Sequence, residues 1–309
     1  MKSETTYPSP RALLDRHDLR AKKTWGQNFL GDPEVLDEIA GLAAPTPGGA
    51  VVELGAGLGH LSWHLLRRGA RVVAVERDRD MVRVLRRELG DRITLLEADA
   101  ARLDWPDLAR RFGSADVQGP TAPSPSRGAP DPGGAGAPAP RLAVVGNLPY
   151  HLSSPILFSI LDAAGSIRRA VFLLQREVAE RLAAEPGGKE YGLLSVLLQR
   201  HADVEVARRV AAGAFWPPPR VESAVLCARF HPPAEAVLSE DRFRRLVKAG
   251  FGQRRKTLRN ALEAGRVASP ERLAVALEAA GISPERRGET LSVAEWAALE
   301  RALGKVPVP

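Results

Sequence analysis

Val51-Val52-Glu53-Leu54-Gly55-Ala56-Gly57-Leu58-Gly59 is an apolar run that enters a glycine-rich turn, and leucines at helical spacing follow it. The order strand, glycine turn, helix is typical of the first unit of an open α/β sheet, where a cofactor binds at the helix N-terminus. Glycine allows the tight turn and a close approach of backbone to ligand, so Gly55, Gly57 and Gly59 are candidate cofactor contacts. A dinucleotide-binding fingerprint would place glycine at position 60, where this chain has His60. The stretch therefore predicts an α/β cofactor domain.

Three carboxylates lie at or near the ends of successive predicted strands. Glu53 comes late in the strand quoted above, Glu76 ends the strand 71–75, and Asp99 follows the strand 93–96. Open α/β sheets bind ligands at the carboxyl ends of their strands, where Glu76 would accept from ribose hydroxyls and Asp99 from an adenine amino group. Any one of these acids could be a solvated loop carboxylate. Together with the glycines, they favour a pocket for S-adenosylmethionine over one for NAD.

A further apolar strand, 144–146, stops at Asn147-Leu148-Pro149-Tyr150. Proline lacks an N–H donor and holds its neighbours extended, so the Asn147 amide and the adjacent carbonyls are expected to face outward. An exocyclic amino group on a nucleobase needs acceptors for its N–H bonds and a ring to stack on. The tetrapeptide offers both. An ordinary strand-to-turn junction with a buried tyrosine is the alternative.

The order of these motifs resembles the ribosomal RNA adenine N6,N6-dimethyltransferase family, and within it the bacterial small-subunit branch. The similarity covers about residues 20–112 and 141–303. It is carried by Gln27-Asn28-Phe29-Leu30, Glu53 to Gly59, Glu76, Asp99, Asn147 to Tyr150, and Phe215-Trp216-Pro217-Pro218-Pro219-Arg220-Val221-Glu222-Ser223-Ala224-Val225. The resemblance implies an enzyme that transfers methyl groups from S-adenosylmethionine to N6 of two adjacent adenosines near the 3′ end of small-subunit rRNA. The product would be N6,N6-dimethyladenosine, formed during ribosome biogenesis.

The resemblance also assigns roles in the cofactor pocket. It places Gln27, Asn28 and Leu30 over the methionine end of the cofactor and Glu76 on its ribose. It places Asp99 on the cofactor's adenine amino group. The implied cofactor contacts are Gln27, Asn28, Leu30, Glu53, Gly55, Gly57, Gly59, Glu76, Arg77, Asp99, Ala100 and Asn147.

A second set of residues is implied for the target adenine. Its N6–H bonds would point to the Asn147 side-chain oxygen and to the Leu148 carbonyl, which Pro149 holds in place. Such bonds favour a pyramidal nitrogen whose lone pair is aimed at the methyl group. Tyr150 and Phe215 would stack on the two faces of the base. Core packing of Phe215, within a rigid turn, is the alternative.

Basic residues are concentrated near the C-terminus. The chain has 309 residues and a net charge of +7, and between Arg242 and Arg266 it has nine Lys or Arg and one acid, Glu263. A solvated helix face normally carries both signs, so this segment is expected to contact RNA phosphates. The candidate contacts are Arg244, Arg245, Lys248, Arg254, Arg255 and Lys256.

Composition also predicts the domain organisation. Residues 1–20 are polar and expected to be loosely ordered, and residues 21–235 should form a Rossmann-like class I methyltransferase domain of the α/β class. Within it, Gly113–Pro140 has thirteen Gly or Pro among 28 residues and is expected to be a disordered surface insert. Residues 236–309 should form a small all-helical domain. Ser292 and Glu295 have the spacing of a capping box.

The remaining expectations concern compartment, partners and alternatives. The single Cys227 excludes an intramolecular disulfide and a cysteine-based zinc cluster, so no metal is expected. No signal core or membrane-length apolar stretch is present, which indicates a cytoplasmic protein. The protein is expected to be a monomer whose partner is small-subunit rRNA or its pre-ribosomal particle. Three alternatives stay open: a large-subunit rRNA methyltransferase of the antibiotic-resistance type, a non-catalytic ribosome-assembly factor, and an NAD dehydrogenase.

Overall fold

The computed structural model of the chain describes residues 6–22, 25–43, 48–113, 140–233, 235–253 and 255–305. They belong to two compact units. The first unit comprises residues 1–175 and 207–230, and the second comprises residues 176–206 and 231–309. Residues 114–139 of the expected insert, and Arg254, lie outside the described residues, so those expectations stay predictions.

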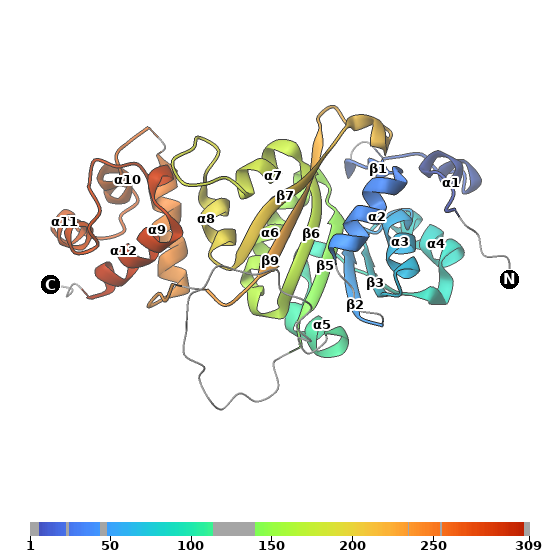
Figure 1. Ribbon diagram of the computed structural model, residues 1–309, viewed down its shortest axis with the longest axis horizontal. Helices are drawn as coiled ribbons and strands as arrows, with labels where there is room; N and C mark the ends of the chain where they lie inside the picture. Colours follow the sequence, from blue (N-terminus) through green and yellow to red (C-terminus); the bar gives the residue numbers. More distant parts are fainter. Residues whose placement is uncertain are drawn as a thin grey trace. The chain divides into compact units, whose positions relative to one another are not determined.

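The central element is a seven-stranded sheet in the order β4-β3-β2-β5-β6-β9-β7. Adjacent strands from β4 to β6 pair in parallel, and β9 pairs antiparallel with β6. Every residue of β2 is buried, as expected of a strand covered on both faces. The strands are β2 (Ala50–Leu54), β3 (Arg71–Glu76), β4 (Ile93–Glu97), β5 (Leu142–Asn147), β6 (Ile167–Gln175), β7 (Ala202–Val210) and β9 (Ser223–Phe230). This topology confirms the predicted Rossmann-like α/β sheet (Figure 1).

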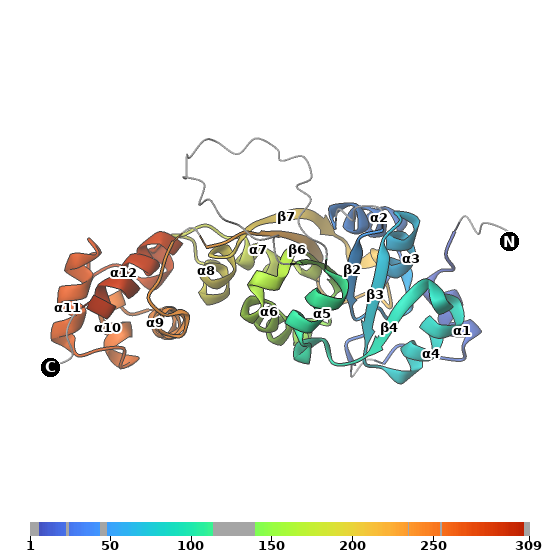
Figure 2. The ribbon, with the colours of Figure 1, turned by 90° about the horizontal axis from the view of Figure 1, so that it is seen from below.

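Helices of the first unit lie on both faces of its sheet. Figure 2 shows α2 (Pro33–Leu42) and α3 (His60–Arg67) on one face, and α5 (Trp105–Phe112) and α6 (Ser153–Asp162) on the opposite one. A further helix, α4 (Arg79–Glu88), packs against the β3–β4 edge. Beside the sheet, the short strand β1 (Phe29–Leu30) pairs antiparallel with β8 (Phe215–Trp216).

The N-terminal segment is more ordered than its composition suggested. Pro10–Arg16 forms helix α1, which begins where the Ser9 hydroxyl accepts from the Ala12 N–H. Leu13 and Leu14 are buried, in a cluster that includes Phe29, Leu58 and Met81. The expectation of loose order for residues 1–20 is therefore wrong for α1. Two adjacent leucines supply enough apolar surface to anchor one short helix.

The second unit is helical apart from the first residues of β7. Its helices are α7 (Arg176–Leu182), α8 (Leu193–Gln199), α9 (Glu240–Gly252), α10 (Leu258–Ala264), α11 (Pro270–Ala279) and α12 (Val293–Lys305). The predicted capping box is confirmed, because the Ser292 hydroxyl accepts from the Glu295 N–H and the Glu295 carboxylate accepts from the Ser292 N–H. The expected domain boundary at residue 235 stays a prediction. Within the described residues, no helix is both long and apolar enough to span a membrane.

Candidate active site

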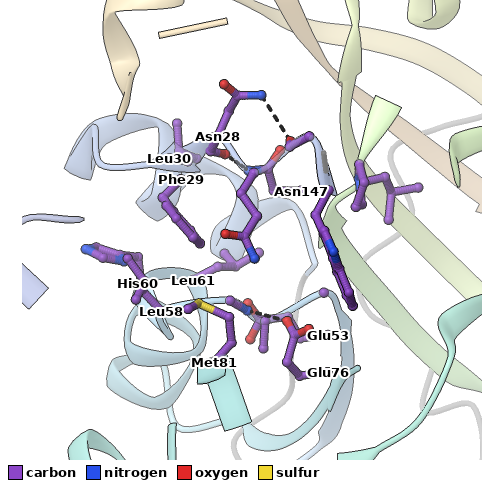
Figure 3. Close-up of a pocket in the computed structure, with 18 of the residues that line it drawn as sticks. Asn28, Phe29, Leu30, Glu53, Leu58, His60, Leu61, Glu76, Met81 and Asn147 are labelled. Carbon is purple, nitrogen blue, oxygen red and sulfur yellow. Dashed lines mark hydrogen bonds between the residues drawn. The ribbon is translucent and has the colours of Figure 1, made fainter. Parts of the chain in front are cut away.

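The carboxyl ends of β2, β3 and β5 meet at one edge of the sheet, as parallel pairing requires. There they border a pocket of about 880 Å³, counting the open space at its mouth. Figure 3 shows Asn28 and Asn147 at one end of this pocket and Glu53, Glu76 and Met81 at the other. The sequence-predicted residues that line it are Gln27, Asn28, Leu30, Glu53, Gly55, Gly57, Glu76, Asn147, Leu148, Pro149 and Tyr150.

Glu76 ties the end of β3 to the glycine turn. Its Oε2 accepts from the Gly57 N–H at 2.9 Å, and its Oε1 accepts from the N–H groups of Arg77 and Asp78, both at 2.8 Å. Burial raises the pKa of Glu76 above its ordinary value, and the three backbone donors oppose that shift. A carboxylate held this way presents acceptor oxygens to the pocket in a fixed position.

Glu53 is the most deeply buried acid of the pocket. Only 2% of it is exposed, and its carboxyl oxygen accepts a hydrogen bond from the Ser62 hydroxyl on α3. Burial raises the pKa of Glu53 to about 8, although the Ser62 hydrogen bond acts in the opposite direction. A positively charged ligand group beside Glu53 would favour the ionised form of this carboxyl.

The glycine turn has the backbone geometry that the sequence predicted. Gly55, Gly57 and Gly59 have φ values of 68°, 56° and 84°, in the left-handed region that favours glycine. At Gly59 a side chain is also excluded by space, because a Cβ would lie 2.8 Å from a Leu89 methyl and 3.0 Å from the Tyr7 hydroxyl. Gly59 does not line the pocket itself and instead starts α3.

A second hollow adjoins the first and shares Gly55, Glu76, Leu148 and Pro149 with it. It adds Arg77, Asp99 and Ala100, the residues expected around the cofactor's adenine. Asp99 Oδ1 accepts from the Ala101 N–H at 3.0 Å, and Oδ2 accepts from the Arg77 guanidinium at 2.9 Å. These partners, the backbone N–H first, hold the pKa of Asp99 below its ordinary value. Asp99 is therefore a permanent acceptor at neutral pH.

Asn147 ends β5, and its side-chain amide is held in place. The Asn147 Nδ2 donates to the Asn28 carbonyl at 2.9 Å, an orientation that turns the amide oxygen away from that carbonyl. Leu148 is buried, and its N–H donates to the Leu173 carbonyl of β6 at 3.2 Å. The carbonyls of Pro149 and Tyr150 both accept from the Ser153 hydroxyl. The Asn147 amide is thus fixed at the junction between β5 and α6, and the acceptor roles of its oxygen and of the Leu148 carbonyl stay predictions.

The two rings expected to stack on the target base occupy different environments. Tyr150 lines the pocket, and its hydroxyl pairs with the Ser223 hydroxyl at 2.8 Å, which fixes the tip of the ring. Phe215 is 4% exposed, belongs to the core beside Leu30 and Val225, and does not line the pocket. Core packing therefore describes Phe215 in this structure, and its stacking role stays a prediction.

The Gln27 and Asn28 amides are engaged within the polypeptide. Gln27 Nε2 donates to Asp78 at 2.7 Å and its Oε1 accepts from the Lys22 N–H at 2.9 Å, whereas Asn28 Nδ2 donates to the Gly26 carbonyl. These bonds hold the segment 26–30, whose residues line the pocket. The roles expected of Gln27 and Asn28 toward the cofactor stay predictions.

Several pocket residues were not predicted from the sequence. Trp25, Phe29, Leu58, Leu61 and Met81 form apolar walls, and single apolar residues carry no motif signal. His60 is 7% exposed and its Nε2 lies 2.9 Å from the Pro8 carbonyl, while the Tyr7 hydroxyl donates to the Leu58 carbonyl at 2.8 Å. Burial lowers the pKa of His60 to about 4, so this wall is uncharged. The Ser9-Pro10 helix start was the sequence signal that could have revealed this N-terminal contact.

In the second unit, Arg244, Arg245 and Lys248 lie on α9, and Arg255 and Lys256 lie between α9 and α10. Arg245 and Lys248 border a groove, whereas Arg244, Arg255 and Lys256 are not part of its lining. The structure therefore divides the predicted RNA contacts into two groups.

Comparison with known proteins gives consistent matches along the chain. A "Ribosomal RNA small subunit methyltransferase A" of Anaeromyxobacter sp. (strain K) is 70% identical over 298 residues, covering 96% of this chain and 99% of that protein. The protein of the same name from Myxococcus xanthus (strain DK1622) is 49% identical, with 96% and 95% covered.

Solved structures share the fold. The dimethyladenosine transferase of Plasmodium falciparum superposes with a TM-score of 0.65 at 21% identity, covering 88% of this chain and 95% of that one. The 23S rRNA methyltransferase ErmE has a TM-score of 0.62 at 24% identity, with 90% and 100% covered. The family described as "Ribosomal RNA adenine dimethylase" matches residues 18–304. This chain therefore belongs to the ribosomal RNA adenine dimethylase family.

Proposed function

We propose that this protein transfers methyl groups from S-adenosylmethionine to N6 of two adjacent adenosines near the 3′ end of small-subunit rRNA. The observation that carries the proposal is the position of Asn147-Leu148-Pro149-Tyr150, which ends β5 inside a pocket bordered by Glu53 and Glu76. Relatives named for the small-subunit enzyme, one of them 70% identical, support the choice of substrate. The reaction would take place in the cytoplasm, with a monomer acting on a pre-ribosomal particle.

The pocket residues fit a nucleoside that carries positive charge. Glu76 and Asp99 supply acceptors for ribose hydroxyls and an adenine amino group, and Glu53 lies at the inner end for a cationic ammonium or sulfonium group. S-adenosylmethionine would supply an electrophilic methyl group on its sulfonium. Acidic side chains at three strand ends, together with the glycine turn, favour this cofactor over a dinucleotide.

The protein's own task is to prepare the nucleophile. The lone pair of adenine N6 is delocalised into the ring, so the nitrogen attacks poorly unless its hydrogen bonds favour a pyramidal geometry. The Asn147 amide oxygen and the Leu148 carbonyl would accept the two N6–H bonds, because the Asn147 Nδ2 is already committed to the Asn28 carbonyl. Such preorganised acceptors contribute several kcal/mol when they match the transition state.

Proton removal needs no dedicated base. Once N6 carries the new methyl group, its proton is acidic and leaves to water. After the first transfer N6 retains one N–H, so the second transfer requires a pocket that keeps one of the two acceptors and tolerates a methyl group at the other. Tyr150, held by Ser223, would stack on the base and help offset its unstacking from the RNA, worth about 1–3 kcal/mol.

Methyl transfer from labelled S-adenosylmethionine tests the proposal. Small-subunit and large-subunit particles that lack the modification would be incubated with the enzyme side by side, and the labelled nucleoside identified after nuclease digestion. We expect N6,N6-dimethyladenosine in the small-subunit rRNA only. Label confined to the large subunit would assign the protein to the resistance-type branch. Tight particle binding without any label would favour an assembly factor.

A further inference from the structure

A groove in the second unit is lined by α9, by the loop between α10 and α11, and by the ends of α11 and α12. It encloses about 1330 Å³, counting the open space at its mouth. Its charged rim consists of Arg242, Arg245, Lys248, Arg266 and Arg272. Leu246, which is buried, and the half-buried Val267 and Leu303 form the apolar floor of its lining. Basic groups thus converge on the groove from three separate parts of the chain.

The acid in the groove is already neutralised. Among the described residues that line it, Glu300 is the sole acid, and it is 1% exposed. Its carboxylate accepts from the N–H groups of Leu238 and Ser239 and from the Arg242 guanidinium, whose NH2 lies 2.9 Å from Oε1. Glu300 and Arg242 are therefore structural partners that tie α12 to the start of α9.

Three cations of the rim are left for another partner. Within the part of the second unit that the structure describes, Arg245, Lys248 and Arg266 form no salt bridge, and the Arg245 Nε donates to the backbone carbonyl of Asp241 at 3.3 Å. Other arginines of the unit are paired: Arg259 with Glu263, Arg286 with Glu295, and Arg301 with Glu235. Unpaired cations concentrated at one concavity are the electrostatic pattern of a polyanion site.

We infer that this groove binds a phosphodiester segment of the rRNA substrate, an inference that rests on the proposed function. Phosphate oxygens would contact Lys248 and Arg266 at the rim, where a guanidinium matches the geometry of a phosphate. The apolar floor would accept the less polar faces of the intervening sugar or base. Phosphate contacts of this kind position an RNA without reading its sequence.

The test uses the full-length protein with Lys248→Gln and Arg266→Gln combined. Binding to small-subunit particles that lack the modification would be measured over a series of potassium chloride concentrations, without cofactor. Losing two phosphate contacts should weaken binding by on the order of tenfold at low salt. It should reduce the slope of log K against log salt by about 1.4 to 1.8.

The matched control is Arg86→Gln with Arg87→Gln, which removes the same charge from exposed positions on α4 of the first unit. The control should keep the wild-type slope, and both variants should bind S-adenosylhomocysteine as the wild type does. A wild-type slope in the groove variant, or an equal loss in the control, overturns the inference. A groove variant that loses binding to an acidic peptide but keeps the wild-type salt slope with rRNA particles would also overturn the inference.

This design separates the groove from the reaction. Binding is measured without methyl transfer, so a wild-type protein that binds but does not methylate would contradict the proposed function and leave the groove intact. If the wild type is active and the Lys248→Gln and Arg266→Gln variant keeps its salt slope, only the inference about the groove is contradicted.

Discussion

The pocket of the first unit and the groove of the second handle charge in opposite ways. Glu53 and Glu76 are buried, and each is held by donors from its own surroundings. Lys248 and Arg266 are exposed, and neither forms a salt bridge among the described residues. Buried, oriented charges act strongly but depend on protonation, whereas exposed charges act at longer range and are screened by salt. We therefore expect the pocket to respond to pH and the groove to respond to ionic strength.

Replacing Asn147 should have the greatest effect on catalysis in the pocket. Asn147→Ala removes the acceptor assigned to N6 and the donor to the Asn28 carbonyl. We expect kcat for methyl transfer to fall about 10²–10³-fold, the usual loss for one preorganised transition-state contact. Particle binding and its salt slope should stay unchanged, because Asn147 carries no charge and is not one of the residues assigned to phosphate contacts. A variant with normal kcat would contradict the role of Asn147.

Glu53 should make the stability of the folded protein depend on pH. The pKa of Glu53 is raised from 4.5 to about 8, so the folded state favours the neutral acid. The stabilising contribution of Glu53 is complete below pH 4.5 and is lost as pH rises through 8. Glu53→Gln resembles the neutral form and keeps an acceptor for Ser62. As the pH rises, the free energy of unfolding of this variant should increase relative to that of the wild type, by at most about 1.4 kcal/mol per pH unit.

Chemical denaturation at several pH values between 5 and 8 would measure that difference. Glu97→Gln, at the exposed end of β4, is the control that removes an acid without this burial. A difference between Glu53→Gln and the wild type that is the same at every pH would show that Glu53 is ionised in the folded protein.

Asp99 lies in the hollow that adjoins the pocket, where the cofactor's adenine is expected. Asp99→Asn keeps an oxygen for the Ala101 N–H but loses the charge that pairs with Arg77. We expect affinity for S-adenosylhomocysteine, measured by calorimetry, to fall about tenfold, in line with one charged hydrogen bond. Asp107→Asn is the control, since Asp107 pairs with Arg110 and Arg111 on the surface of α5. Equal losses in the two variants would remove Asp99 from the cofactor site.

The sequence revealed the pocket's polar residues better than its walls. Parallel strands bring their carboxyl ends to one edge, so Glu53, Glu76 and Asn147 could be placed together once the strands were recognised. The walls could not be placed this way. Met81 lies on α4 and Phe29 on β1, and an apolar residue has the same signature whether it lines a pocket or fills the core.

Two further differences arise from tertiary packing. Phe215 lies in the core because β8 pairs with β1, a contact between segments far apart in the sequence that no local motif predicts. The groove was only partly predicted, since Arg245 and Lys248 lie in the basic run but Arg266 reaches the groove from the following loop. Charge density along the chain therefore located the basic region, and folding selected the cations that share one surface.

A weaker effect is expected at Tyr7, which tests how far the preorganisation of the pocket extends beyond the residues that line it. The Tyr7 hydroxyl donates to the Leu58 carbonyl in the glycine turn, whereas the buried Tyr191 hydroxyl of the second unit has no hydrogen-bond partner among the described residues. Tyr7→Phe should lower the free energy of unfolding by about 1 kcal/mol, and Tyr191→Phe should leave it unchanged or raise it slightly. If Tyr7 also positions Leu58 against the cofactor, Tyr7→Phe should weaken S-adenosylhomocysteine binding while Tyr191→Phe does not. A Tyr7→Phe protein that is less stable but binds normally would confine the preorganised region to the residues that line the pocket.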